Sequence, residues 1–410
     1  MATTSKKGGL LGVLERAKAD KKLSIDRDTF RTGDEIVETI STGSIIVDKL
    51  LGRGNSIGGI GKGRLTEIFG LESSGKTTLA LHIAKEIQNR GGNVAFFDFE
   101  QALDIDYAEK AIGINIAEER FSWLTPKNLE EGCNLAEYLV DNYSDSKIDL
   151  IIMDSVKAMQ PRAVIEGLIG DEPPMALQAR KIGQFVGKMT KKISKTNTIL
   201  ILLNQMTKNI KSNPYQSGGE FETPGGLSIR FYASSRILLK QTSKETTEQL
   251  NPITNAQEEM PSASKVRANI IKNKIGTPYR SAEFYIKYGS GIDNKRSVLD
   301  MAIAHNVIKQ AGSWFSYKED SGGFRFQGEE TMREFLLAPE NKGTLKEILD
   351  QIILKQDEKV KEEAKHFEEE EKIVERKLAN KLRGSKLLKE EKEAKTESEE
   401  LLKEKEATAE

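Results

Sequence analysis

The sequence is poor in residues that crosslink a chain or bind zinc. One of its 410 residues is a cysteine, Cys133, and three are histidines, His82, His305 and His366. A single thiol cannot close an intramolecular disulfide, and these residues leave no zinc-ligand cluster. No apolar run approaches the roughly 18 residues that cross a bilayer, and residues 1–25 lack a signal peptide's apolar segment. These absences predict a soluble, cytoplasmic protein with no membrane partner.

Net charge is also nearly absent, because 62 Lys and Arg stand against 63 Asp and Glu. This balance argues against a protein that coats nucleic acid by bulk charge. The charges are unevenly spread: residues 357–410 hold 14 basic and 18 acidic residues, a net charge of −4. We therefore expect a charged tail, mobile or partly helical, after Gln356.

Short apolar runs alternate with amphipathic stretches between residues 38 and 293. The runs are Leu65–Phe69, Val94–Phe99, Leu150–Met153, Ile199–Leu203 and Ile237–Leu239. Strands of this length alternating with helices predict an α/β fold around a mostly parallel central sheet. Residues 266–274 and 281–288, joined by a Gly-Thr-Pro turn, predict an antiparallel hairpin at one end of the sheet.

Further segments flank this core. The amphipathic stretch Leu10–Lys21 has an apolar stripe that needs a partner, either the chain's own core or a neighbouring copy. Residues 294–356 combine helix-like runs with a Gly-rich turn and predict a small C-terminal α/β domain. The predicted parts are an N-terminal helix and oligomerisation segment (1–37), the core (38–293), the C-terminal domain (294–356) and the tail (357–410).

The most specific motif runs from Gly70 to Thr77 and has the pattern GxxxxGK[ST]. It lies between a strand-like and a helix-like run, which is the setting of a phosphate-binding loop. In such a loop backbone N–H groups surround the phosphates, the lysine neutralises the outer ones and the last hydroxyl binds Mg²⁺. We therefore predict a nucleotide and Mg²⁺ at Gly70, Leu71, Glu72, Ser73, Ser74, Gly75, Lys76, Thr77 and Thr78.

Acidic side chains end two other strands. Asp154 closes an apolar run and is predicted to hold the metal's water shell. Glu100 lies at the carboxyl end of the run VAFFDF, where open parallel sheets place their reaction crevice, and can polarise an attacking water. Asp98 and Asp104 compete for that role, and position alone does not separate them.

Asn204 and Gln205 end a further strand, where an amide either senses a γ-phosphate or only caps the strand. Residues 206–226 follow with little apolar periodicity, and so long a structureless loop is usually functional or disordered. Because the loop leaves directly from the amides, we expect its conformation to depend on the bound nucleotide.

Eight segments in order make the chain resemble bacterial RecA recombinases from about Leu10 to about Ile353. They are Glu38–Ser44, Leu71–Thr78, Phe96–Asp104, Glu166–Asp171, Asn204–Gln205, Gly225–Arg236, Lys272–Tyr279 and Ala282–Ile292. The resemblance implies a RecA-type ATPase core that forms a helical filament on single-stranded DNA when ATP is bound. It also implies pairing with homologous duplex and strand exchange in recombination, DNA repair and the SOS response to DNA damage. A single-strand-binding protein or loader is a further implied partner.

The resemblance also implies roles for residues at matching positions. Glu100 activates water, and Gln205 couples the γ-phosphate to the second DNA loop. Lys272 and Lys274 reach across the subunit interface toward the γ-phosphate; without the resemblance they are solvated charges at a strand end. The matching adenine contacts are Asp104 and Tyr107 and, from the neighbouring subunit, Tyr288 and Gly289.

For DNA, the resemblance places a first loop at 166–176 and a second at 206–226. The matching DNA contacts are Met175, Arg180, Gly225, Gly226 and Arg236, with Arg230 as a further contact where Lys is usual, and Phe231 matches a position of subunit coupling. The chain departs from the family at Thr207 and Gly187, where Arg is usual, at the Pro173–Pro174 pair and in its mixed-charge tail. These departures indicate a divergent member and make a phage origin one interpretation.

Two alternatives remain open at this point. A filament scaffold could bind ATP and DNA mainly to activate a partner, although intact Lys76, Glu100 and Gln205 favour hydrolysis. A ring helicase could use the same core, but the short N-terminal helix and the Lys272–Lys274 pair favour a filament.

Overall fold

The computed structural model describes residues 37–53, 56–117, 119–168, 176–208, 221–250, 256–318, 323–352 and 354–355. The predicted N-terminal helix at Leu10–Lys21, the Pro173–Pro174 pair and the tail 357–410 lie outside these residues. In the described part of the chain, no helix has the length and apolar character needed to span a bilayer.

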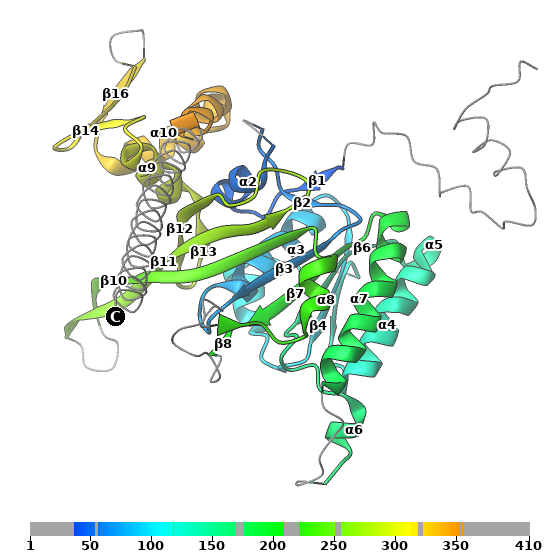
Figure 1. The fold of residues 1–410 in the computed structure, drawn as a ribbon. Helices are drawn as coiled ribbons and strands as arrows, with labels where there is room; N and C mark the ends of the chain where they lie inside the picture. The colour runs from blue at the N-terminus through cyan, green and yellow to red at the C-terminus, as the bar shows by residue number, and fades with distance from the viewer. Residues whose placement is uncertain are drawn as a thin grey trace, which may run out of the picture.

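Nine strands form the central sheet (Figure 1): β3 (Leu65–Gly70), β4 (Asn93–Asp98), β5 (Phe121–Leu124), β6 (Ile148–Asp154), β7 (Ile199–Gln205), β10 (Ser235–Leu250), β11 (Gln257–Asn273), β12 (Ser281–Lys287) and β13 (Gly291–Asp293). Their order is β13-β12-β11-β10-β3-β7-β6-β4-β5, and the six strands from β10 to β5 are parallel. The predicted α/β class with a mostly parallel sheet is confirmed. The predicted hairpin is also present, since β11 pairs antiparallel with β12.

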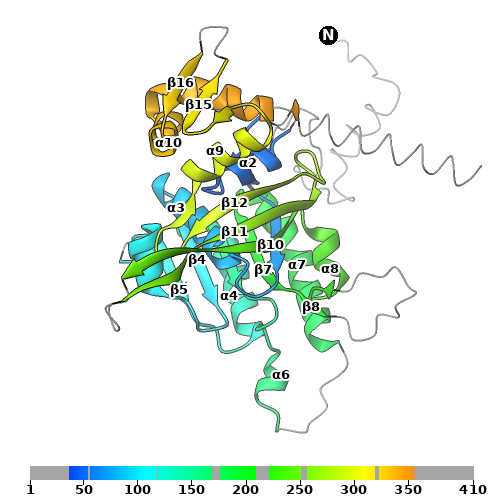
Figure 2. The same cartoon turned by 90° about the vertical axis from the view of Figure 1, so that its left-hand side faces the viewer.

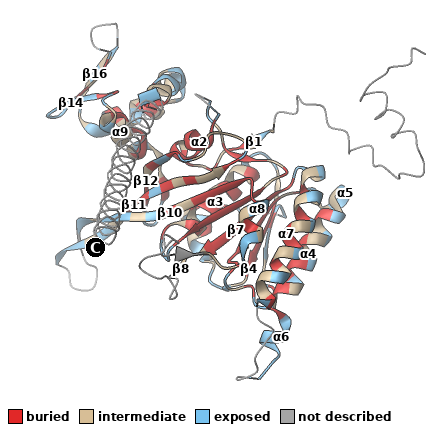
Figure 3. Ribbon diagram, in the orientation of Figure 1, coloured by how far each residue is buried: buried red, intermediate tan, exposed pale blue. Residues whose placement is uncertain are grey.

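Helices cover the two faces of the sheet. One hydrophobic core joins the sheet to α2 (Ile45–Leu51), α3 (Lys76–Asn89) and the short π-type turn η2 (Tyr107–Ile112). The other joins it to α4 (Leu129–Asp141), α7 (Leu177–Thr196) and α8 (Leu227–Tyr232). Consecutive residues of one strand enter different cores, as Ile152 and Met153 of β6 do. Burial on both faces explains why these strands are continuous apolar runs, and Figure 3 shows the buried sheet between its helices.

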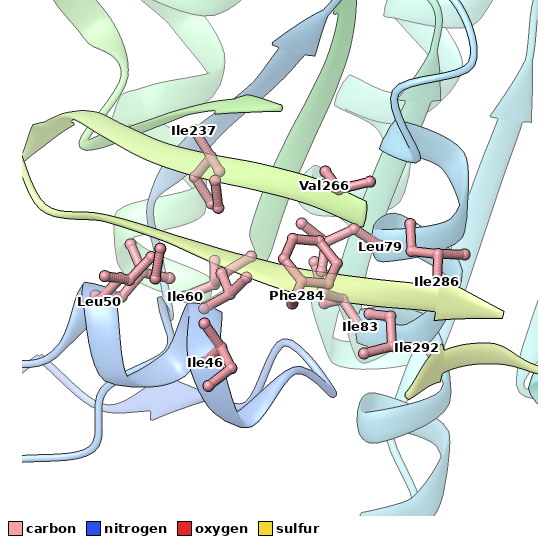
Figure 4. Close-up of a cluster of buried hydrophobic side chains, with 14 of the residues drawn as sticks. Ile46, Leu50, Ile60, Leu79, Ile83, Ile237, Val266, Phe284, Ile286 and Ile292 are labelled. Carbon is pink, nitrogen blue, oxygen red and sulfur yellow. The ribbon is translucent and has the colours of Figure 1, made fainter. Parts of the chain in front are cut away.

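The first core holds α3 in place against the antiparallel end of the sheet. Figure 4 shows Leu79 and Ile83 of α3 in one cluster with Phe284 and Ile286 of β12 and Ile292 of β13. All five side chains are buried. The helix that follows the phosphate loop is therefore packed against β12 and β13 as well as against β3.

Strands β10 and β11 are longer than their neighbours. β3 pairs only with Ser235–Leu239 of β10, and β12 only with Ala263–Asn269 of β11. The two strands continue to pair with each other as far as Leu250 and Gln257. The residues beyond the sheet form a projecting two-stranded ribbon (Figure 2). The predicted run Ile237–Leu239 is thus only the part of β10 that lies in the core.

A C-terminal module follows the sheet. It consists of α9 (Asn294–Ala304), β14 (Lys309–Ala311), β15 (Trp314–Tyr317), β16 (Phe324–Gln327), α10 (Glu329–Leu337), η4 (Pro339–Asn341) and a last helix at 342–352. Its three strands form an antiparallel sheet. Buried side chains such as Phe315 and Leu336 join the core that contains α3. An ion pair 2.5 Å long between the buried Lys49 of α2 and the half-buried Asp350 connects the last helix to the main domain.

Candidate nucleotide site

The predicted phosphate loop connects β3 to α3 at the carboxyl edge of the parallel strands. β3 is buried along its whole length, and Lys76 is the first residue of α3. Gly75 has φ +86°, a backbone conformation that favours glycine, and a Cβ atom there would overlap Cδ1 of Ile286. The backbone of the loop therefore fixes where the helix begins.

The N-terminus of α3 is suited to an anion. Gly75 provides no side-chain cap, and the first turn contains no acidic residue. Ser74 adds a buried hydroxyl that has no hydrogen-bond partner among the described residues. Exposed N–H groups at a helix N-terminus and an unsatisfied hydroxyl can both bind phosphate oxygens. The predicted phosphate contacts lie together here: Gly70, Leu71, Glu72, Ser73, Ser74, Gly75, Lys76, Thr77 and Thr78.

Lys76 lies across the loop. Its Nζ donates to the carbonyl oxygens of Leu71 (2.8 Å) and Gly70 (3.4 Å). Burial lowers the pKa of Lys76, and nearby carboxylates, above all Asp154, oppose that shift. The ammonium group is thus held at the mouth of the loop, where the motif predicts the outer phosphates.

Thr77 and Asp154 face each other beside the loop, and the Thr77 hydroxyl donates to Oδ2 of Asp154 over 2.8 Å. Burial raises the pKa of Asp154 to about 6, and the charges of Glu100 and Asp98 add to this effect. No three His, Cys, Asp or Glu side chains gather as a metal site in the described ranges. Mg²⁺ usually takes only one or two protein ligands beside phosphate and water. Thr77 with Asp154 behind it fits that requirement.

Glu100 lies just past the end of β4 with two polar partners. Its Oε1 accepts a hydrogen bond from Nε2 of Gln205 (3.0 Å) and another from the Ser155 hydroxyl. Gln205 in turn accepts from Nζ of Lys157 over 3.2 Å. The predicted water-activating residue and the predicted sensor are therefore in direct contact.

The two acids that competed with Glu100 have structural partners. Asp98 is buried and accepts from the backbone N–H groups of Ala102 (3.3 Å) and Leu103 (3.0 Å). Asp104 accepts from the N–H of Tyr107 over 2.9 Å. Both carboxylates stabilise turns of the chain, so the geometry favours Glu100 as the base.

Tyr107 marks the side of the site where a nucleotide base would lie. Its hydroxyl is 3.3 Å from the hydroxyl of Thr78, in the first turn of α3. Burial raises the pKa of Tyr107. Asp104, also predicted to contact adenine, fixes the backbone at the start of η2. These residues form one wall beside the phosphate loop.

Tyr288 and Gly289 lie on the turn between β12 and β13. The Tyr288 hydroxyl bonds with the Ser264 hydroxyl of β11 over 2.6 Å. Ile286, near the end of β12, packs against Gly75 of the phosphate loop.

The strand that follows this turn lies against the chain's own α3 and η2: a Cβ atom on Gly291 would come within 2.4 Å of Nε2 of His82 and within 2.7 Å of Cδ1 of Ile112. The Tyr288 side chain is partly exposed, and a Cβ atom on Gly289 would meet nothing within 4 Å. Their contact with the nucleotide of a neighbouring subunit stays a prediction.

Asn204 connects the sensor strand to the second loop. Its Nδ2 donates to Glu67 (2.9 Å) and to the carbonyl oxygen of Pro224 (2.9 Å). Glu67 also bonds Nε of Arg236 over 2.5 Å. Arg236 is only 9% exposed, which does not fit its predicted contact with DNA. The structure instead uses its guanidinium to join β10 to β3.

Three other predicted DNA contacts lie at the end of the second loop. Arg180 is exposed in the first turn of α7, and a Cβ atom on Gly226 would come within 3.2 Å of the neighbouring Ala179. Gly225 has φ +90°, and a Cβ there would come within 2.6 Å of Ile229. Two short strands, β8 (Thr207–Lys208) and β9 (Phe221–Glu222), pair at the base of the loop. Met175 and most of both loops lie outside the described residues.

Lys272 stabilises the C-terminal end of α8. Its Nζ donates to the carbonyl oxygens of Arg230 (2.6 Å) and Phe231 (3.1 Å), and burial lowers its pKa, with the charges of Lys274 and Arg236 adding. The Phe231 side chain is 70% exposed. In the strand register Lys272 lies opposite Arg236, and Arg236 lies opposite Glu67. Along the strands Lys272 is therefore about 10 Å from the start of the phosphate loop, toward the amino end of β3.

Two polar residues at the site were missed from the sequence. Ser155 follows Asp154 directly and Lys157 comes two residues later, but a hydroxyl and an ammonium group after a strand carry no distinctive pattern. Only the parallel pairing of β4, β6 and β7 brings them to Glu100 and Gln205. These two residues can therefore be recognised only from the three-dimensional structure.

The parallel sheet, the phosphate loop and the acids at the strand ends define a P-loop nucleotide-binding protein. Family models give a more particular assignment: the RecA N-terminal domain matches residues 18–293, and the RecA C-terminal domain matches residues 296–357. The chain belongs to the RecA family, the recombinases of DNA recombination and repair. Members of this family are DNA-dependent ATPases that use ATP, generally with Mg²⁺, bind DNA and assemble into filaments.

Curated relatives support the same assignment. Protein RecA of Caulobacter vibrioides is 38% identical over 327 residues, which cover 80% of this chain and 83% of the relative. Protein RecA of Rickettsia africae is 40% identical over 300 residues, 73% of this chain and 80% of the relative. Protein RecA of Enterococcus hirae is 38% identical over 303 residues, 74% and 80% of the two chains. The predicted resemblance is confirmed.

Proposed function

We propose that this chain hydrolyses ATP with Mg²⁺ in response to single-stranded DNA, forms a helical filament on it and exchanges strands with homologous duplex. The hydrogen bond between Glu100 and Gln205 supports this proposal most directly. Gln205 is the last residue of β7, and the second loop begins at the next residue. A change in the hydrogen bonding of Gln205 when nucleotide binds would therefore act directly on the first residue of the candidate DNA loop.

The residues of the site divide the work of hydrolysis. Lys76 and the N–H groups of the phosphate loop would bind the outer phosphates, while Thr77 and Asp154 would hold Mg²⁺, which would supply charge neutralisation. Glu100 accepts the proton of the attacking water. In the described conformation this carboxylate accepts hydrogen bonds from Gln205 and Ser155. A γ-phosphate offers the Gln205 amide another acceptor, which frees Glu100 and shifts the start of the loop.

Other residues are assigned to DNA and to the neighbouring subunit. Arg180, Gly225 and Gly226 would contact the phosphate backbone, together with Met175 and Arg230, which suits a protein that accepts any sequence. Lys272 and Lys274 would reach the γ-phosphate of an adjacent copy. The exposed apolar side chains of α8, Leu227 at 62% and Phe231 at 70%, would pack against that copy.

ATP hydrolysis by the full chain tests the proposal. We expect Mg²⁺-dependent turnover that rises at least about tenfold when single-stranded DNA is added. Electron microscopy with a slowly hydrolysed ATP analogue should show helical filaments on the DNA. Filaments without turnover would favour the scaffold, and closed rings would favour a helicase.

A further inference from the structure

His82 lies on the face of α3 that points toward β13. It comes four residues after Thr78, so the two side chains share one face of the helix. Its Nε2 accepts a hydrogen bond from the backbone N–H of Ile292 over 3.0 Å. This bond joins the helix of the phosphate loop to the strand that follows the Tyr288–Ser290 turn.

The imidazole fills a slot between two glycines. A Cβ atom on Gly43 would lie 2.8 Å from Cβ of His82, and one on Gly291 would overlap its Nε2. Both glycines have positive φ, +77° in each case. The next residue of the helix, Ile83, shares a buried cluster with Ile292 (Figure 4). The ring is therefore held against β13 from several sides.

The protonation state suits an acceptor. Burial lowers the pKa of His82 to about 4, and the nearby charge of Lys85 contributes. The ring is neutral at physiological pH, so Nε2 keeps the lone pair that receives the Ile292 N–H. A side chain without an acceptor would leave that backbone donor unpaired.

We propose that His82 is a positioning residue for the nucleotide base. In this inference one wall of the base site is Tyr107, which contacts Thr78 on α3. The other is the chain's own turn with Tyr288 and Gly289, because Gly291 just after it lies close to Ile112 of the Tyr107–Ile112 element. His82 connects α3 to the second wall and so sets the distance between the two. This inference rests on the proposed nucleotide function. It concerns the base alone, because His82 bonds to β13 and not to the phosphate loop, which ends five residues earlier at Thr77.

The test compares two probes, ADP and inorganic tripolyphosphate, which has no base. In His82→Leu, we expect the dissociation constant for ADP to rise about fivefold, the effect of one lost hydrogen bond, and that for tripolyphosphate to change less than about twofold. His82→Gln supplies a new acceptor oxygen and should remain within about twofold for both probes. In DNA-stimulated hydrolysis the KM for ATP of His82→Leu should rise by the same factor while kcat is retained.

Two further variants keep the test decisive. Gln88→Leu removes other hydrogen bonds of α3, those to the backbone of Asn115, and should leave both dissociation constants unchanged. Gly291→Ala crowds His82 from the other side and should weaken ADP binding selectively, even if His82→Leu does not fold. Thermal unfolding identifies folded variants.

The inference is overturned if folded His82→Leu binds ADP as the parent does, or loses ADP and tripolyphosphate equally. It also fails if His82→Gln is as impaired as His82→Leu. A parent chain that binds ADP but shows no DNA-dependent hydrolysis would refute the proposed function and leave this comparison of probes intact.

Discussion

The side-chain amide of Gln205 donates a hydrogen bond to the carboxylate of Glu100 over 3.0 Å, although 105 residues separate them in the chain. The candidate base and the candidate sensor are therefore hydrogen-bonded to each other. Lys157, which donates to Gln205, lies in the segment that leads to the predicted first DNA loop. Substitutions at these positions should therefore separate chemistry from DNA response.

Glu100→Gln keeps the shape of the side chain and removes the base. We expect kcat for ATP hydrolysis to fall by about 100-fold or more, while ADP binding and filament assembly survive. Steady-state hydrolysis and electron microscopy of the same preparation measure both. Turnover within a few-fold of the parent would return Asp98 and Asp104 to consideration.

Gln205→Ala removes the link between Glu100 and the second loop. The expected result is a loss of DNA stimulation by about tenfold or more, because the loop no longer responds to the nucleotide. Hydrolysis is measured over a range of single-stranded DNA concentrations. If stimulation is unchanged, the amide only caps β7.

Lys76→Ala removes the cation at the mouth of the phosphate loop. Nucleotide binding should weaken, hydrolysis should be lost and filaments should fail to form, since assembly is expected to need bound ATP. Binding of ADP measured by calorimetry checks the first step. Normal DNA-stimulated turnover in this variant would contradict the assignment of the loop.

Arg236 and Glu67 form an ion pair in which the Glu67 side chain is fully buried and that of Arg236 is 11% exposed. Arg236→Met leaves a buried carboxylate without its partner, so we expect the free energy of unfolding to fall by about 3–5 kcal/mol. Arg236→Met combined with Glu67→Gln should cost less, because no charge is left unpaired. Urea unfolding measures both.

The unfolding experiment can also support the prediction from sequence that Arg236 contacts DNA. If Arg236→Met unfolds like the parent but lowers the salt dependence of DNA binding, its guanidinium contacts phosphate. Salt titrations of DNA affinity therefore accompany the unfolding experiments.

The charged tail gives a prediction that depends on composition alone. Residues 357–410 carry a net charge of −4 and can compete weakly with duplex for basic surfaces. Truncation after Gln356 should raise duplex affinity by no more than about threefold, with less gain at high salt, because screening acts over about 8–10 Å. Hydrolysis stimulated by single-stranded DNA should be nearly unchanged. Complete loss of strand exchange would show that the tail takes part in the reaction.

The phosphate loop could be predicted because its signal is local. A short motif between a strand and a helix determines where Lys76 and Thr77 lie, and the apolar runs identified the parallel strands because both sheet faces are buried. The full length of β10 escaped prediction for the opposite reason. Beyond Leu239 the strand no longer pairs with β3, and residues 240–248 are exposed or half-buried, so no buried face imposes an apolar pattern.

Tertiary contacts explain the other differences. The sequence gives no sign that Arg236 meets Glu67, because 169 residues separate them and each is a common charged residue. The sequence likewise gives no sign that the strand before Tyr288 packs on the phosphate loop. That contact, between Ile286 and Gly75, is revealed only by the folded sheet.

The ribbon formed by β10 and β11 affects how copies of the chain can associate when they are held close together. Its two open edges present backbone N–H and C=O groups, which can pair with strands of other molecules when many copies are held close together. Pro261 lacks an N–H on one of these strands, and the register shifts between Gln241 and Ser243 and between Glu245 and Thr246 distort the other. These features oppose edge-to-edge pairing of ribbons, so copies held side by side in the proposed filament would not form amyloid-like contacts through them.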